Sequence, residues 1–98
     1  MRRSLRFDAA AERELNEAVE FYDLESPGLG DVLLGEREHA LAQVEAFPDA
    51  SEPLRDGIRR RLLRRFPCAL LYSLRPAEIR ILAVAHTRRR PFYWKDRR

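Results

Sequence analysis

The residues best suited to chemistry gather near the C-terminus, in the segment AHTRRRPFYW from Ala85 to Trp94. His86 is a candidate general acid or base, because histidine exchanges a proton near neutral pH. Three consecutive arginines follow it, and their planar guanidinium groups suit phosphates, while the aromatic rings behind them can stack on bases. The segment therefore predicts a nucleic-acid site, a clasp whose rings pin the C-terminus to the core, or both.

A second basic cluster lies in RDGIRRRLLRRF, which runs from Arg55 to Phe66. Because side chains alternate along a strand, Arg60 is expected on one face, and Arg59 and Arg61 on the other. We expect a concave face between the two clusters, with candidate residues from both. The candidates for catalysis, should the chain be a nuclease, are His86, Arg88 and Tyr93. The candidates for target binding are Arg59, Arg60, Arg61, Arg65, Arg89, Arg90 and Trp94.

Charge is divided unevenly along the 98 residues. Residues 1–50 hold 5 arginines and 12 acids, a balance of −7, whereas residues 51–98 hold 14 basic residues and 4 acids, a balance of +10. All the basic residues except Lys95 are arginines. This asymmetry predicts that the second half meets a polyanion or an acidic partner.

Several classes of protein are disfavoured by composition and motif. The single cysteine, Cys68, excludes an internal disulfide and is interpreted as a small buried hydrophobe. His39 has no cysteine or histidine at metal-ligand spacing and is expected on the surface. There is no glycine-rich phosphate loop, and no apolar run is long enough to span a bilayer. We therefore expect a cytoplasmic protein with no cofactor, metal site or membrane span.

Hydrophobic periodicity divides the chain into a helical part and a strand-rich part. Ser4–Phe7 alternates like a short strand, and Asp8 is a plausible N-cap for a helix that ends near the SPGLG break. Ser26 and Pro27 resemble the start of a second helix, which carries an apolar stripe and stops at Pro48. The residues of that stripe are Leu34, Leu41, Val44 and Phe47.

The pattern of the second half predicts a linker at 48–57, followed by three strands joined by short turns. The predicted strands are Ile58–Phe66, Cys68–Leu74 and Ile79–His86. The last two are nearly continuous apolar runs, which is typical of central strands buried on both faces. The order of elements is β-α-α-β-β-β, so we predict one α+β domain over residues 1–98, with a helical hairpin packed on a small antiparallel sheet.

Three segments resemble the RelE/ParE superfamily of type II toxin–antitoxin toxins. They are AERELNEAVEFYDLESPGLG, GIRRRLLRRFPCALLY and ILAVAHTRRRPFYW, in the order of elements typical of that superfamily and covering nearly the whole chain. The fold that this resemblance implies is the one predicted above. It also implies a bacterial cytoplasmic toxin, a cognate antitoxin that neutralises it, and a toxin–antitoxin hetero-oligomer.

The superfamily has two activities, and the sequence departs from the pattern of one of them. RelE-like members cleave messenger RNA on the ribosome, whereas ParE-like members inhibit DNA gyrase. RelE-like enzymes commonly carry an arginine early in the central strand, where this chain has Ala69, and lysines on the preceding strand, where it has Arg60 and Leu62. The resemblance therefore favours ParE-like gyrase inhibition. A RelE-like mRNA endonuclease and a non-toxic basic module that binds nucleic acid or a partner remain as alternatives.

Overall fold

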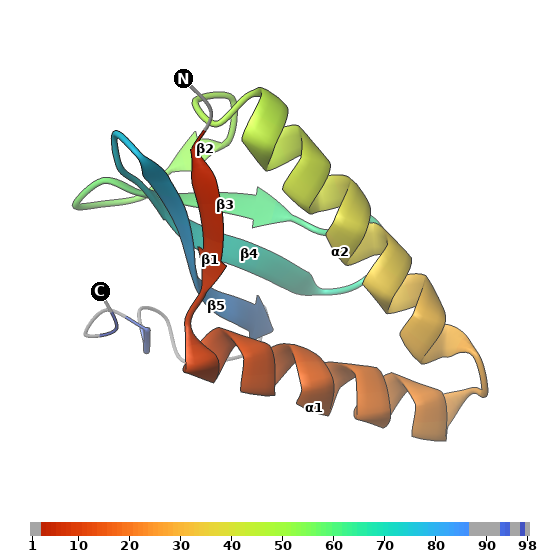
Figure 1. The fold of residues 1–98 in the computed structure, drawn as a ribbon. Coiled ribbons are helices and arrows are strands. Elements are labelled where there is room, and N and C mark those ends of the chain that lie inside the picture. The colour runs from red at the N-terminus through yellow and green to blue at the C-terminus, as the bar shows by residue number, and fades with distance from the viewer. Residues whose placement is uncertain (1–2, 87–92, 95–96, 98) are drawn as a thin grey trace.

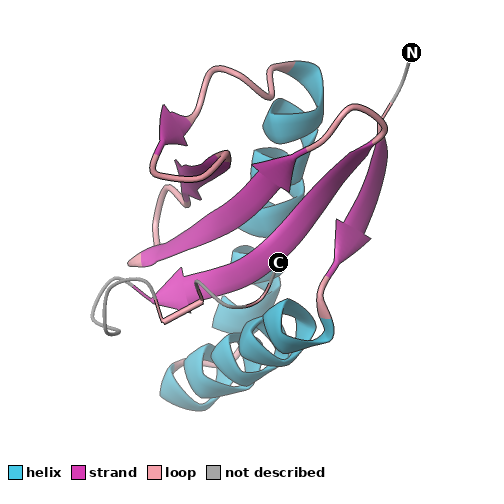
Figure 2. Cartoon of the chain, turned by 90° about the vertical axis from the view of Figure 1, so that its left-hand side faces the viewer, coloured by secondary structure: helices cyan, strands magenta, loops and turns pink. Residues whose placement is uncertain are grey.

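Two helices cover one face of a five-stranded sheet (Figures 1 and 2). The computed structural model describes residues 3–86, 93–94 and 97. The helices are α1 (Ala9–Glu25) and α2 (Leu29–Ala46). The strands are β1 (Ser4–Phe7), β2 (Glu52–Pro53), β3 (Ile58–Leu62), β4 (Cys68–Leu74) and β5 (Glu78–His86). The predicted α+β class is confirmed, with the helical hairpin on one side of the sheet.

The sheet has the strand order β1-β5-β4-β3-β2 and is not wholly antiparallel. Strands β2 to β5 pair antiparallel with their neighbours, as a meander does, but β1 pairs parallel to β5, with Ser4 opposite Glu78 and Phe7 opposite Ile81. The prediction of a purely antiparallel sheet was therefore wrong at this edge. Between β1 and β5 the chain passes through both helices and through strands β2 to β4, so the connection is long enough for two parallel strands.

Strand β2 was not predicted, because its residues lie in a linker rich in turn formers. Glu52 pairs with Arg60, and Pro53 pairs with Arg59, at the outer edge of the sheet. Proline has no N–H for a ladder and is therefore tolerated in an edge strand. Strand β3 ends at Leu62, earlier than the predicted Phe66, because residues 63–67 form the turn into β4.

The central strands are buried on both faces, as predicted. On the face beneath the helices, Leu70 and Tyr72 of β4 pack with Leu33 of α2. On the other face, Leu71 and Leu82 pack with residues that include Trp94. The sheet is thus the middle layer of the molecule, with helices on one side and part of the C-terminal segment on the other.

The helix boundaries differ from the prediction at the hairpin bend. Asp8 precedes α1 as expected, but its carboxylate accepts a hydrogen bond from Arg80 at 2.6 Å and makes no side-chain cap. Helix α2 starts at Leu29, after Gly28 in the left-handed conformation with φ of 90°. The predicted start at Ser26 and Pro27 was wrong, because Ser26 instead closes α1 with a backbone hydrogen bond to Tyr22.

The apolar stripe of α2 is shifted from its predicted position. Leu41 and Val44 are buried, and Leu34 is half-buried. Phe47 lies beyond the end of the helix and is 68% exposed, whereas Leu33 is fully buried. Neither described helix has the length and apolar character that a bilayer-spanning segment needs.

Candidate functional site

Strand β5 ends beside the start of β4, so His86 and the turn between β3 and β4 share one rim of the sheet. Cys68 is the register partner of His86, and Leu62 is that of Ala69. The exposed side chains of Arg64 and Arg65 lie in that turn. The turn at residues 63–67 and the end of the last strand therefore lie on the same side of the sheet.

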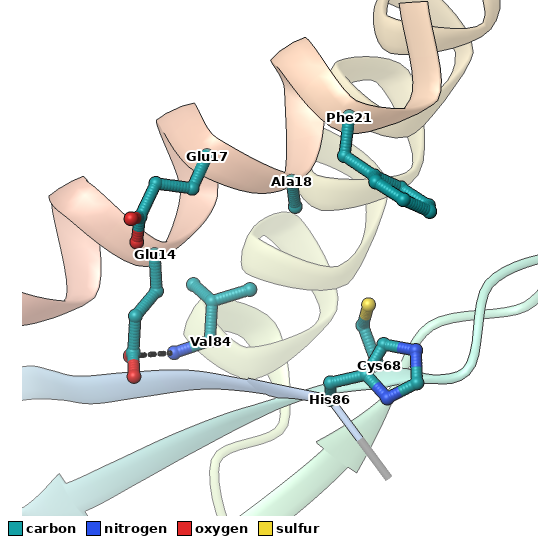
Figure 3. Close-up of a pocket in the computed structure, with 7 residues that line it drawn as sticks. All are labelled: Glu14, Glu17, Ala18, Phe21, Cys68, Val84 and His86. Carbon is teal, nitrogen blue, oxygen red and sulfur yellow. Dashed lines mark hydrogen bonds between the residues drawn. The ribbon is translucent and has the colours of Figure 1, made fainter. Parts of the chain in front are cut away.

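His86 lines a pocket of about 340 Å³ between α1 and the ends of β4 and β5 (Figure 3). The sulfur of Cys68 faces α1 across this space, and Phe21 projects from α1 above it (Figure 3). The described residues that line the pocket are Glu14, Glu17, Ala18, Phe21, Cys68, Val84 and His86. His86 therefore lies on the helix-covered side of the sheet, among apolar groups and two carboxylates, with no arginine among these lining residues.

The carboxylate of Glu14 organises the wall of this pocket. It accepts hydrogen bonds from the Val84 backbone N–H at 3.1 Å and from the Tyr93 hydroxyl at 2.7 Å. It also accepts two from the guanidinium of Arg97, at 2.8 and 3.1 Å. These hydrogen bonds raise the pKa of Arg97 further above its ordinary value.

Arg97 completes this arrangement at the open edge of β5. Strand β1 pairs only as far as Ile81, so the β5 edge beyond it is not covered by a strand. Arg97 donates to the Leu82 carbonyl at 3.2 Å, and Glu14 accepts from the Val84 N–H. The guanidinium also lies over the Tyr93 ring, 5.0 Å from its centroid. Two side chains thus bond two of the backbone groups that an exposed edge would offer to another strand.

Trp94 lies on the opposite face of the sheet from His86. It is 4% exposed and packs in a cluster with Ile58, Leu71 and Leu82. The prediction that aromatic residues clasp the C-terminus to the core is confirmed for Trp94. The expected collection of Trp94 and His86 on one concave face is not observed, because the sheet separates them.

Two of the candidate arginines are held by neighbouring parts of the same chain. Arg59 donates to the backbone carbonyls of Asp49 at 3.1 Å and Ser51 at 2.7 Å. Arg60 forms an ion pair with Glu52, its partner across the β2–β3 ladder. Both arginines therefore fasten the segment at 49–53 to β3. This role was not predicted, since the groups that bind the two arginines lie 8 to 10 positions away in sequence.

The remaining candidates are placed as follows. Arg61 is half-buried on the helix side of β3, in register with Leu70, and Arg65 is exposed in the turn. Tyr93 is half-buried against the same cluster as Trp94, with its hydroxyl on Glu14. Arg88, Arg89 and Arg90 lie outside the described residues.

Cys68 and His39 agree with their sequence-based interpretation. Cys68 is 2% exposed, and burial raises the pKa of its thiol, an effect that a hydrogen bond with Tyr22 partly opposes. A raised pKa and burial disfavour the nucleophilic thiolate. His39 is exposed on α2. Over the described part of the chain, no group of three or more His, Cys, Asp or Glu side chains could hold a metal ion.

Sequence comparisons give no relative: no protein-family model matches the chain, and no curated protein sequence matches it. Solved structures do match. A chain of the chromosomal ParDE TA system from P. aeruginosa has 20% identity and a TM-score of 0.75, over 86% of this chain and 95% of that one. A chain of the toxin–antitoxin complex RelBE2 from Mycobacterium tuberculosis has 25% identity and a TM-score of 0.59, over 88% of this chain and 99% of that one. These likenesses confirm the resemblance read from the sequence: the chain has the fold of the RelE/ParE superfamily.

Proposed function

We propose that this chain is the toxin of a type II toxin–antitoxin system, which acts in the bacterial cytoplasm and is neutralised by a cognate antitoxin. The two solved structures described above belong to toxin–antitoxin systems, and each likeness covers more than four fifths of both chains. The mode of action is ParE-like: the chain inhibits DNA gyrase and does not cleave RNA.

The residues around His86 favour gyrase inhibition over RNA cleavage. A nuclease of this fold needs its acid–base group beside cationic side chains that stabilise charge at the scissile phosphate. His86 instead shares its pocket with the carboxylates of Glu14 and Glu17. Glu14 is neutralised by Arg97, but Glu17 is exposed and forms no ion pair with another described residue. The described lining of this pocket therefore offers an entering phosphate an unpaired carboxylate and no arginine or lysine.

The partners of the other candidates support the same choice. Arg60 is engaged by Glu52, and the Tyr93 hydroxyl is engaged by Glu14. At the position where RelE-like enzymes commonly carry an arginine, Ala69 is 2% exposed and packs into the core on the face opposite His86. Recruiting these groups for RNA cleavage would require existing contacts to break.

A RelE-like, ribosome-dependent mRNA endonuclease is the second candidate, favoured by one observation. His86 and the exposed Arg64 and Arg65 share a rim of the sheet. An RNA backbone lying along that rim, outside the pocket, would meet cations and a titratable histidine together.

The two candidates are separated by controlled induction in a bacterial host, with DNA synthesis and protein synthesis followed by separate pulse labels. The ParE-like function predicts that DNA synthesis fails first and that the SOS response is induced. It also predicts that His86→Ala stays as toxic as the control His39→Ala, which changes an exposed histidine on α2.

Three results would contradict this function. Protein synthesis collapsing first, with cleaved transcripts, would favour the endonuclease, and loss of toxicity in His86→Ala alone would assign the histidine to catalysis. Growth that is unaffected by soluble, folded protein would favour a non-toxic binding module.

A further inference from the structure

The outward face of α1 carries large apolar side chains that no described residue covers. Phe21 is 55% exposed and Leu24 is 81% exposed. Glu17, Phe21 and Leu24 have the spacing that places helical residues on one face. Burial of these two side chains by a partner would be favourable, because it removes apolar surface from water. Contiguous exposed apolar surface is typical of interaction sites.

The pocket beside His86 opens next to this face. Phe21 belongs to both, since its ring forms part of the pocket wall (Figure 3). The lining near it is apolar, with Ala18, Val84 and Cys68. A cavity of about 340 Å³ is large enough for one large apolar side chain, which would bury the exposed side of the Phe21 ring.

The charge that α1 itself carries beside this patch is negative. Helix α1 holds six acids and one base, Arg13. Two of the acids are already engaged, since Glu14 pairs with Arg97 and Asp23 accepts the Gly30 N–H. The exposed acids that make no ion pair with a described residue are Glu12, Glu17, Glu20 and Glu25. A partner that approaches Phe21 and Leu24 therefore meets carboxylates along the patch, and basic side chains would complement them.

The shape of the site favours a helix over an added strand. The open edge of β5 beyond Ile81 is the place where a strand would pair, but Glu14 already bonds the Val84 N–H and Arg97 the Leu82 carbonyl. What remains accessible is a row of side chains parallel to α1 and a pocket at its side. Such a row is matched by anchors on one face of an amphipathic helix.

We propose that the α1 face formed by Glu17, Phe21 and Leu24, together with the adjoining pocket, docks a basic amphipathic helix of a partner protein. One apolar anchor enters the pocket against Phe21, and flanking lysines or arginines meet Glu17 and Glu20. The helical part of this surface belongs to the acidic half of the chain, and Cys68, Val84 and His86 of the other half line the adjoining pocket. The proposal does not depend on toxicity or on its target.

The test uses the purified full chain and three synthetic 18-residue peptides. The first contains leucine and lysine, with leucines on one helical face. The second replaces each lysine with glutamate, and the third scrambles the first so that it has no apolar face. Fluorescence anisotropy should give the first peptide a dissociation constant at least about tenfold below those of the other two. Its binding should weaken as salt is raised.

Matched variants locate the binding surface. Phe21→Ala should weaken binding of the first peptide about tenfold, because it removes the proposed interface anchor. The control is Phe47→Ala, which removes another exposed ring and should leave the dissociation constant within about twofold of the wild-type value. Glu17→Lys should weaken binding, whereas Glu45→Lys, at an exposed acid on α2, should not. Circular dichroism and thermal unfolding of each variant confirm that it is folded.

Three outcomes would overturn the proposal. The first and third peptides could bind equally, which would mean attraction by charge alone. Phe47→Ala could weaken binding as much as Phe21→Ala, which would place the peptide elsewhere. Sedimentation could show that the chain self-associates through Phe21, with loss in Phe21→Ala, which would make a second copy the occupant.

Discussion

Glu14 and Arg97, 83 positions apart in sequence, form a two-point ion pair that fastens the C-terminal segment to α1. The Glu14 side chain is 10% exposed and that of Arg97 is 22% exposed. The same carboxylate bonds Tyr93 and the β5 backbone, so one acid joins a helix, a strand and the C-terminal segment. The clasp predicted from the aromatic residues therefore also has an electrostatic part.

Removal of Glu14 should destabilise the protein. Glu14→Ala leaves the Arg97 charge, the Tyr93 hydroxyl and the Val84 N–H without their shared acceptor. We expect a loss of about 2 kcal/mol or more in the free energy of unfolding, measured by urea denaturation. Glu17→Ala, one helical turn away and exposed, is the control and should change stability by less than about 0.5 kcal/mol. Equal effects of the two variants would show that the pair contributes nothing.

Trp94 should report the docking of the C-terminus directly, because it is the only tryptophan in the chain. Its burial predicts fluorescence at shorter wavelength in the native protein than in the urea-unfolded protein. Trp94→Ala should cost about 3–5 kcal/mol, since it empties a packed site against Leu71 and Leu82. Native emission at the wavelength of the unfolded chain would contradict the clasp.

The bend between the helices allows a double-mutant cycle. The Gly30 N–H donates to Asp23 at 2.7 Å, and a Cβ at Gly30 would come within 2.8 Å of that carboxylate. Asp23→Ala should cost about 1 kcal/mol through loss of this hydrogen bond. Gly30→Ala should bring little or no gain in the wild type, because it displaces Asp23.

The same substitution should stabilise the Asp23→Ala background by up to about 1 kcal/mol, through the better helix propensity of alanine. Thermal or urea unfolding of the wild type, the two single variants and the double variant gives the coupling free energy between Asp23 and Gly30. Additive effects would show that the carboxylate does not restrict Gly30.

Stability should fall in alkaline solution partly through Cys68. Burial raises the pKa of this thiol above its ordinary value of 9.0, so the folded state favours the protonated form. The contribution of the protonated thiol to the free energy of unfolding is fully present below about pH 9. It is lost as the pH rises through the pKa of Cys68 in the folded state, because the thiol of the unfolded chain ionises first. Urea unfolding from about pH 7 to about pH 10 should show a steeper decline for the wild type than for Cys68→Ala. Parallel curves would contradict this.

Much of the fold follows from local pattern, and what was missed depends on distant contacts. Strands β4 and β5 were predicted because continuous apolar runs indicate burial on both faces. The parallel pairing of β1 with β5 has no local signature, since Ser4–Phe7 fits either direction equally well. Strand β2 escaped prediction because Glu52 and Pro53 become a strand only through pairing with β3.

The candidate site was predicted in part for the same reason. His86 was identified by residue type, and the structure places it at the rim of the sheet, opposite Cys68. Its pocket could not be predicted, because Glu14, Glu17 and Phe21 come from a helix some 70 residues earlier. Nor does any spacing indicate that Arg60 is engaged by Glu52 or that Glu14 binds Tyr93.

The most direct test of the proposed function is a comparison of two purified targets. The folded chain is added to DNA gyrase with relaxed plasmid, and separately to translating ribosomes with a defined mRNA. We expect inhibition of supercoiling with accumulated cleaved DNA, intact mRNA, and the same inhibition with His86→Ala. Unaffected supercoiling together with mRNA cleavage that His86→Ala abolishes would contradict the ParE-like function.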